Sequence, residues 1–144
     1  MADLIKHGEP GHPSETSVAE YLAEKLQSPY QVHYAIKLGR EQTDFDCIVV
    51  APHAVYAIEI KAYGEKITFD PQNSKWVLSS GDKKAAATDQ AARNCSILNT
   101  LLKEYYVGFK DVPVQAVVCL FAENKPDVAS LPEHQRRLTF WYRD

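Results

Sequence analysis

The chain has 144 residues, of which 45% are hydrophobic and 24% are charged, and this is the size and composition of one ordinary globular domain. The formal net charge of −3 excludes a general electrostatic attraction to nucleic acid, so any phosphate-binding surface must be local. No run in the sequence approaches the roughly 20 apolar residues that a membrane span needs, so no membrane partner is expected.

The first part of the chain predicts an irregular lead-in, then a helix and a strand. Residues 1–13 contain the Gly- and Pro-rich stretch HGEPGHP, which is typical of irregular structure. After Ser14, a good N-cap residue, apolar side chains recur every four residues and predict an amphipathic helix over about 14–27. In YQVHYAIKL, residues 30–38, apolar and polar side chains alternate, which predicts a strand.

Short turns join this first strand to two more. FDCIVVA at 45–51 is rich in β-branched residues, and VYAIEIK at 55–61 follows it after only the three residues PHA. Strands joined so closely are expected to form an antiparallel meander. The segments KITFD and KWVLSS flank PQNS and predict a further small hairpin within residues 66–80.

The second half of the chain returns to a helix and then to strands. An apolar stripe predicts a helix over about 84–106, and VPVQAVVCLFA at 112–122 is typical of a buried strand. A polar loop precedes a final predicted strand at 138–142. The order α-β-β-β-(hairpin)-α-β-β indicates a single α/β (α+β) domain over 14–144. Because the sequence stops just after a strand, it could be a fragment of a longer multidomain protein.

Two opposite charges stand inside a run that otherwise indicates a buried strand. Glu59 and Lys61 lie on the same face of 55–61, since alternate residues of a strand point the same way. Removing a carboxylate and an ammonium from water costs free energy even when they pair. If the strands at 45–51 and 55–61 pair through the PHA turn, Asp46 lies beside both charges.

This group of residues predicts a metal site. Two carboxylates at one sheet edge repel each other unless a cation lies between them, and hard oxygen ligands suit Mg²⁺ or Mn²⁺. Asp46 and Glu59 supply the one or two carboxylates that Mg²⁺ usually takes, while Lys61 is suited to orient or deprotonate an attacking water. Glu15 and Gln90 fall on the buried stripes of the two predicted helices and therefore point inward as well.

Each of these residues also has an ordinary structural interpretation. A Glu-x-Lys on a strand is commonly an exposed salt bridge, which contributes little to stability. Asp46 could belong to the preceding turn, and Glu15 could interact with the dipole in the first turn of its helix. Gln90 could be an amide on a helix surface.

The same residues resemble the PD-(D/E)xK phosphodiesterase superfamily and, within it, the NERD (nuclease-related) domain. The resemblance covers roughly residues 12–122 and rests on SETSVAEYL, DFDCIVVAPHAVYAIEIKAYGEKI, TDQAARN and Trp76 in the predicted hairpin. Ala86 and Ala87 depart from it, because the family usually has Asn-Pro at these two positions. The resemblance implies a restriction-endonuclease-like core, with a mixed β-sheet flanked by helices.

The resemblance also implies a divalent-metal-dependent nuclease that hydrolyses DNA phosphodiester bonds, with RNA not excluded as a substrate. Carried over residue by residue, it gives a catalytic set with three main and two accessory members: Asp46, Glu59, Lys61, then Glu15 and Gln90. The Mg²⁺ or Mn²⁺ ion would be held by three side chains and one backbone carbonyl: Asp46, Glu59, Glu15 and the carbonyl of Ile60.

A second function stays open beside the nuclease. The domain could be a catalytically silent nuclease-fold module that binds DNA or a partner domain, since NERD-like domains occur fused to kinase- or helicase-like segments. A chain with net negative charge could also need such a domain, or a second copy in a homodimer, to hold its substrate.

The cysteines and the N-terminus predict where the protein works. The three cysteines form no CxxC pair and no Cys/His zinc pattern, which favours a reducing compartment. The first residues lack the apolar segment of a signal peptide. Together these features predict a cytoplasmic location.

Overall fold

The computed structural model describes residues 1–143 and is built around a six-stranded mixed sheet in the order β1-β2-β3-β4-β8-β9. Its strands are β1 (Asp3–Lys6), β2 (Gln31–Leu38), β3 (Thr43–Val50), β4 (Val55–Lys61), β8 (Val114–Ala122) and β9 (Thr139–Arg143). As predicted, β2, β3 and β4 form an antiparallel meander, whereas β1 is parallel to β2, and β8 and β9 continue the sheet in parallel beyond β4.

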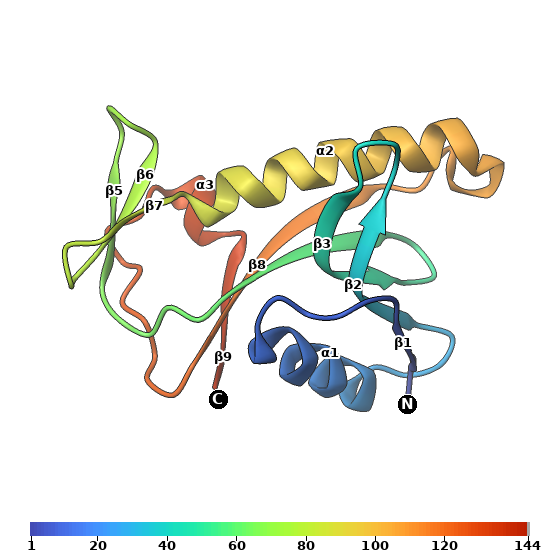
Figure 1. Cartoon of the computed structure of the whole chain (residues 1–144), viewed down its shortest axis with the longest axis horizontal. Coiled ribbons are helices and arrows are strands. Elements are labelled where there is room, and N and C mark those ends of the chain that lie inside the picture. The colour runs from blue at the N-terminus through green and yellow to red at the C-terminus, as the bar shows by residue number, and fades with distance from the viewer. Residues whose placement is uncertain (144) are drawn as a thin grey trace.

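Two long helices flank this sheet, which confirms the predicted architecture (Figure 1). Helix α1 (Pro13–Lys25) packs against β1 to β4 on one face, and α2 (Ala87–Tyr105) packs mainly against β4 and β8 on the other. A parallel pair such as β4 and β8 needs a long crossover, and α2 is its main part. None of the helices in the described residues has the length and apolar character needed to cross a bilayer.

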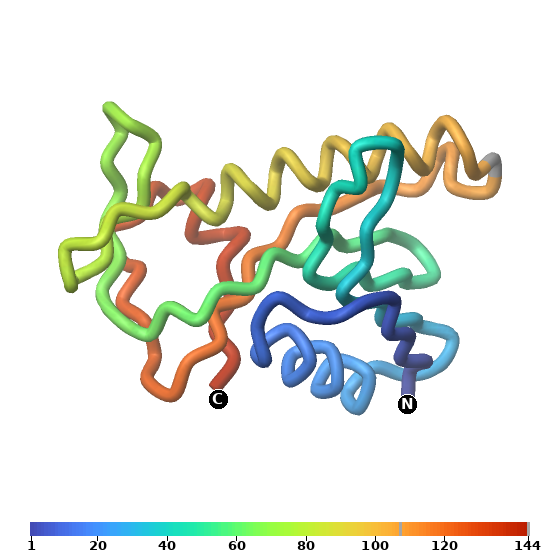
Figure 2. The backbone as a smooth tube through the Cα atoms, in the orientation of Figure 1, coloured from blue at the N-terminus to red at the C-terminus, as the bar shows by residue number. Residues whose placement is uncertain are grey.

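After β4 the chain forms a second, antiparallel sheet that projects from the main body of the molecule (Figure 2). It contains the predicted hairpin, formed by β5 (Ile67–Asp70) and β6 (Lys75–Leu78), and a third strand, β7 (Lys83–Ala85). The apolar stripe predicted a helix from about residue 84, and the alanines after Lys84 also have high helix propensity. Pairing of β7 with β6 overrides that propensity, and α2 begins at Ala87.

The N-terminal segment differs from its prediction. Residues 1–13 were expected to be irregular, but Asp3–Lys6 form a strand at the edge of the large sheet. Its backbone hydrogen bonds reach partners far along the chain, for example from His7 N to Tyr34 O at 3.1 Å. Four residues are too few for a periodic pattern, so the sequence carried no signal for this pairing.

Two shorter helices lie outside the predicted elements, and the second of them replaces part of a predicted polar loop. The 3-10 helix η1 (Val107–Phe109) follows α2, and α3 (Glu133–Arg136) lies in the polar segment before β9. Helix α3 brings Gln135 into the core, where its Oε1 accepts a hydrogen bond of 2.8 Å from Nε1 of the fully buried Trp76. This bond ties the small sheet to the C-terminal part of the chain.

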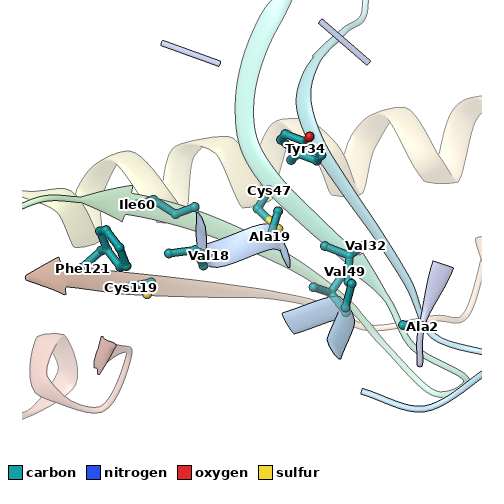
Figure 3. Packing of buried hydrophobic residues seen from close by; sticks show 11 residues of the cluster. Ala2, Val18, Ala19, Val32, Tyr34, Cys47, Val49, Ile60, Cys119 and Phe121 are labelled. Carbon is teal, nitrogen blue, oxygen red and sulfur yellow. The ribbon is translucent and has the colours of Figure 1, made fainter. Parts of the chain in front are cut away.

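The core between α1 and the large sheet is formed by small and β-branched side chains. Figure 3 shows Val18 and Ala19 of α1 facing Val49, Ile60 and residues of neighbouring strands. Each buried Val or Ile side chain stabilises the fold by roughly 1.5–3 kcal/mol relative to an exposed one. This packing fixes α1, and with it the first helical turn, against β3 and β4.

The strands β3 and β4 separate at one end, and this fork positions the candidate site. Their ladder extends only from the pair Val50–Val55 to the pair Cys47–Ile58. Beyond that point β4 continues alone alongside β8 as far as Lys61. On the other side of β3, Ala35 has a positive φ of 53° and interrupts the ladder between β2 and β3. Asp46 of β3 therefore has no ladder partner on either neighbouring strand.

Candidate functional site

Asp46 lies where β3 and β4 separate. Because no backbone carbonyl of β3 reaches Ile60 there, the carboxylate takes its place, and Asp46 Oδ2 accepts a hydrogen bond of 2.8 Å from Ile60 N. This bond holds Asp46 in the fork and uses one of its two oxygen atoms. The prediction that the meander would bring Asp46 beside the end of β4 is confirmed by this contact.

Glu59 and Lys61 lie on the same face of β4, as the strand period predicts. Lys61 Nζ is 3.5 Å from Glu59 Oε1, and the two side chains are only 25% and 12% exposed. The pair is therefore not the exposed surface salt bridge that was the alternative interpretation. Asp46 and Glu59 also line one narrow recess, together with Asn94 of α2.

Glu15 approaches the fork from the opposite face of the sheet. It lies in the first turn of α1, is 9% exposed, and its Oε2 accepts a hydrogen bond of 3.3 Å from Gly11 N. His12 caps this helix, with its Nδ1 accepting from Ser14 N at 3.1 Å. Glu15 and Asp46 line the same larger cavity. Glu15 is therefore placed both to interact with the dipole of α1 and to contribute its carboxylate to the candidate site.

The three carboxyl groups influence one another's ionisation. Burial, and next the charge of Asp46, raise the pKa of Glu59 to about 7, although Lys61 opposes the shift. Burial also raises the pKa of Asp46, against the effect of the Ile60 N–H and of Lys61. The pKa of Glu15 is raised by burial and then by the charge of Asp46. The cluster thus holds more negative than positive charge in a partly dry setting.

Gln90 is the candidate that the structure connects least to the others. It lies in the first turn of α2, next to Ala91, which lines the recess with Asp46 and Glu59. Among the residues that the structure describes, Gln90 Oε1 is one of two buried side-chain atoms with no hydrogen-bond partner; the other is Thr88 Oγ1. Gln90 Oε1 is therefore an acceptor that no other group of the described residues uses.

The donor chemistry of this site fits a hard divalent cation. Within residues 1–143, no three His, Cys, Asp or Glu side chains come close enough to form a metal-binding group by themselves. Magnesium does not need one, because it usually takes one or two carboxylates and completes its shell with waters and phosphate oxygens. Asp46 and Glu59 meet that requirement, and a cation would offset the cost of burial that raises both pKa values and the charge of Asp46 that raises the pKa of Glu59 further.

Two histidines that the sequence did not connect come together beside this site. His7 Nε2 is 2.8 Å from His33 Nδ1, and both side chains line the cavity that contains Glu15 and Asp46. The contact depends on β1, which carries His7 alongside β2. Since β1 had no periodic signal, the sequence could not have predicted the pair.

The comparison with known protein families agrees with the geometry. A family model described as nuclease-related domain, NERD, matches residues 10–121, a range that includes all the candidate site residues. No curated protein and no solved structure shows a significant similarity to the chain.

Proposed function

The chain belongs to the nuclease-related domain family, NERD, and from this membership we propose that it is a Mg²⁺- or Mn²⁺-dependent nuclease that hydrolyses DNA phosphodiester bonds. One observation carries the proposal. At the β3–β4 fork, Asp46 and Glu59 line one recess and Lys61 pairs with Glu59, while burial disfavours the charged form of both carboxylates. A purely structural role would not need this arrangement, whereas cation-dependent hydrolysis does.

The residues of the fork have distinct tasks in this proposal. Asp46 and Glu59 would hold the cation, with help from Glu15 and the backbone carbonyl of Ile60. When bound, the cation would polarise the phosphodiester and stabilise the charge that develops in the transition state. Lys61 would orient or deprotonate the attacking water, or donate to the developing negative charge. Gln90 would hold Lys61 or the nearby backbone in place.

The test is a cleavage assay with purified protein on linear, circular and single-stranded DNA, in Mg²⁺, Mn²⁺ or EDTA. Wild-type protein is expected to cut DNA with metal and not in EDTA. Lys61→Ala and Asp46→Ala should each lower the rate by roughly 100-fold or more, because each removes a group that acts on the reacting atoms.

Lys66→Ala is the matched control for the lysine variant, since Lys66 lies five residues further on and is exposed. It should cleave at close to the wild-type rate. Circular dichroism spectra would establish that all variants are folded. If Lys61→Ala and Asp46→Ala still cleave DNA, these residues are not the nuclease site. If Lys66→Ala loses as much cleavage rate as Lys61→Ala, the effect comes from nonspecific loss of DNA binding.

A second function is suggested by the net charge of −3, since a domain without a broad attraction to nucleic acid could act together with another domain or a second copy. The domain would then be a catalytically silent module that binds DNA or a kinase- or helicase-like partner domain, alone or as a homodimer, in the cytoplasm. No detectable affinity for Mn²⁺ or Mg²⁺, together with retained DNA binding, would favour this alternative over the nuclease.

A further inference from the structure

A cavity of about 960 Å³ opens directly beside the candidate site. Its wall includes Asp46 and Glu15 at one place, and it extends along β2 and β3 to the C-terminal part of α2. Helix α2 packs mainly on β4 and β8, and the cavity lies between β2, β3 and the C-terminal part of α2. The cation site of the proposed nuclease therefore has a large space next to it.

Most of the cavity wall is apolar. Ile36 and Ile48 contribute from the strands, and Leu98 and Leu102 contribute from α2. At its far end, Tyr106 lies edge to face with Phe109, with 6.2 Å between ring centroids, and the Tyr106 side chain is 57% exposed. Flat apolar and aromatic surfaces of this kind suit the faces of nucleobases.

A pair of histidines provides polar groups near the catalytic end. His33 Nε2 lies 3.1 Å from Gln31 Oε1, so the amide oxygen requires a hydrogen on that nitrogen. Neutral His33 then accepts at Nδ1 from His7 Nε2, at 2.8 Å, and the two rings stack with their centroids 5.1 Å apart. Both rings are thereby held at the wall, where they can meet the edge or the face of a base.

The charges of the wall exclude phosphate groups from the interior. Four carboxylates line the cavity, those of Glu9 and Asp44 in addition to Glu15 and Asp46. Lys37 is the one lysine or arginine in the lining, and its Nζ already lies 3.7 Å from Asp44 Oδ1. A ligand that enters here should be uncharged where it meets the wall, with its phosphates kept at the rim beside the cation site.

From these features we infer that the cavity takes unpaired nucleobases of the DNA strand next to the scissile phosphate. The bases of an intact duplex are stacked and paired, so they can enter such a space only after they are extruded, at a cost in free energy. This inference rests on the proposed nuclease function and names its substrate class: single-stranded DNA, or duplex DNA with an unpaired flap, rather than intact duplex.

The test measures binding separately from cleavage. Fluorescence anisotropy with labelled oligonucleotides of one sequence compares a single strand, a blunt duplex and a duplex with a flap, in Ca²⁺ and at one fixed salt concentration. Gels run in parallel show whether any strand is cut. Wild-type protein should bind the single strand and the flap about tenfold or more tightly than the blunt duplex, as expected if one or more bases stack in the cavity.

Two neighbouring tyrosines provide a matched pair of variants. Tyr106→Ala removes an aromatic ring from the cavity wall and should weaken single-strand binding by roughly tenfold. Tyr105→Ala changes a side chain that is 63% exposed and does not line the cavity, so binding should be unchanged. Leu102→Trp is a second variant, which fills the cavity and should abolish the preference for unpaired DNA.

The outcomes separate this inference from the proposed function. Equal binding of single strand and duplex, no effect of Tyr106→Ala and Leu102→Trp, or no binding of any DNA would each overturn the cavity as a base site. If the protein still cleaves duplex DNA in that case, the proposed nuclease function is kept and only the base site is rejected. Preferential single-strand binding that the cavity variants abolish, without cleavage in any metal, would keep the cavity and reject the nuclease.

Discussion

At the residue scale, Glu59 is the side chain whose position is hardest to explain without a ligand. It is only 12% exposed and pairs with a single lysine, while Asp46 adds a second negative charge nearby. The resulting pKa of about 7 means that Glu59 is only partly ionised at neutral pH without a cation. A bound divalent ion would favour the ionised form, so metal binding and proton release at this residue should be linked.

The first prediction concerns the stability of the metal-free protein. The pKa of Glu59 in the folded state is about 7 and lies above its ordinary value of 4.5, so the folded state binds this proton more tightly than the unfolded state. The free energy of unfolding must therefore fall as pH rises from about 4.5 to about 7. Glu15 and Asp46 shift in the same direction. Thermal denaturation in EDTA between about pH 5 and about pH 8 should show the melting temperature decreasing.

Glu59→Gln isolates the contribution of this residue. The variant should melt at a higher temperature than wild type at about pH 8 and should show a shallower dependence on pH, because the amide does not ionise. Glu104→Gln, at an exposed position on α2, should retain the wild-type slope. An unchanged slope in Glu59→Gln would mean that Glu59 is ionised normally in the folded protein.

The second prediction concerns Glu15, for which the sequence left a helix-dipole role and a metal-linked role open. Glu15→Gln should lower cleavage roughly tenfold and raise the Mn²⁺ concentration needed for half-maximal rate, since a ligand linked to the cation is weakened. Glu20→Gln, at an exposed position on the same helix, is the control. If both variants keep the wild-type rate and metal requirement, Glu15 is only a first-turn carboxylate.

At the residue scale, sequence patterns predicted which residues of the site lie side by side but not the backbone geometry that holds them. The strand period and the short PHA turn were enough to bring Asp46 beside Glu59 and Lys61. They could not show that β3 and β4 separate there, so that Asp46 binds Ile60 N in place of a backbone carbonyl. A strand pattern reports which face a side chain occupies and carries no information on where a ladder ends.

At the element scale, the segment after β4 keeps the Lys61 end of that strand against β8. Gly64 lies three residues after Lys61, and a Cβ atom there would be 2.8 Å from Ala122 Cβ and 3.4 Å from Asn124 O. The absence of a side chain thus allows the chain to pass close to the end of β8. If the backbone at Gly64 moved away from β8, Lys61 would move as well, because only two residues separate Gly64 from Lys61.

The third prediction follows from this close approach. Gly64→Ala should destabilise the protein by about 1–3 kcal/mol, as overpacked positions do, and should also lower the cleavage rate. Urea denaturation measures the first effect and the cleavage assay the second. Gly108→Ala is the control, because a Cβ atom there would meet nothing within 4 Å. Equal stability of the two variants would show that the loop adjusts without strain.

The elements that sequence patterns predicted are those with a long periodic signal. The strand expected at 55–61 has the bounds of β4, and the predicted helices differ from α1 and α2 by a few residues at their ends. Among the strands, β1 and β7 were missed; they have only four and three residues and are defined by pairing with other strands. Such pairing depends on the whole fold, which a local pattern does not contain.

At the scale of the whole molecule, the fold brings charged side chains from both faces of one sheet to the β3–β4 fork. Helix α1 delivers Glu15 from one face, Glu59 and Lys61 lie on the other, and Asp46 lies in the gap between the strands. The cavity along β2 and β3 opens at the same point. With a net charge of −3, the molecule offers no broad electrostatic attraction to DNA, so in the proposed nuclease a local cation and contacts to bases would supply much of the recognition.

The measurement that tests the central claim most directly is a calorimetric titration of the metal-free protein with Mn²⁺, compared with the same titration of Asp46→Asn. We predict a saturable site in the wild-type protein and a loss of affinity of about tenfold or more in the variant, which keeps the shape of the side chain but removes its charge. The claim that Asp46 and Glu59 share a divalent ion would be contradicted by wild-type protein that binds no Mn²⁺, or by an Asp46→Asn variant that binds it equally well.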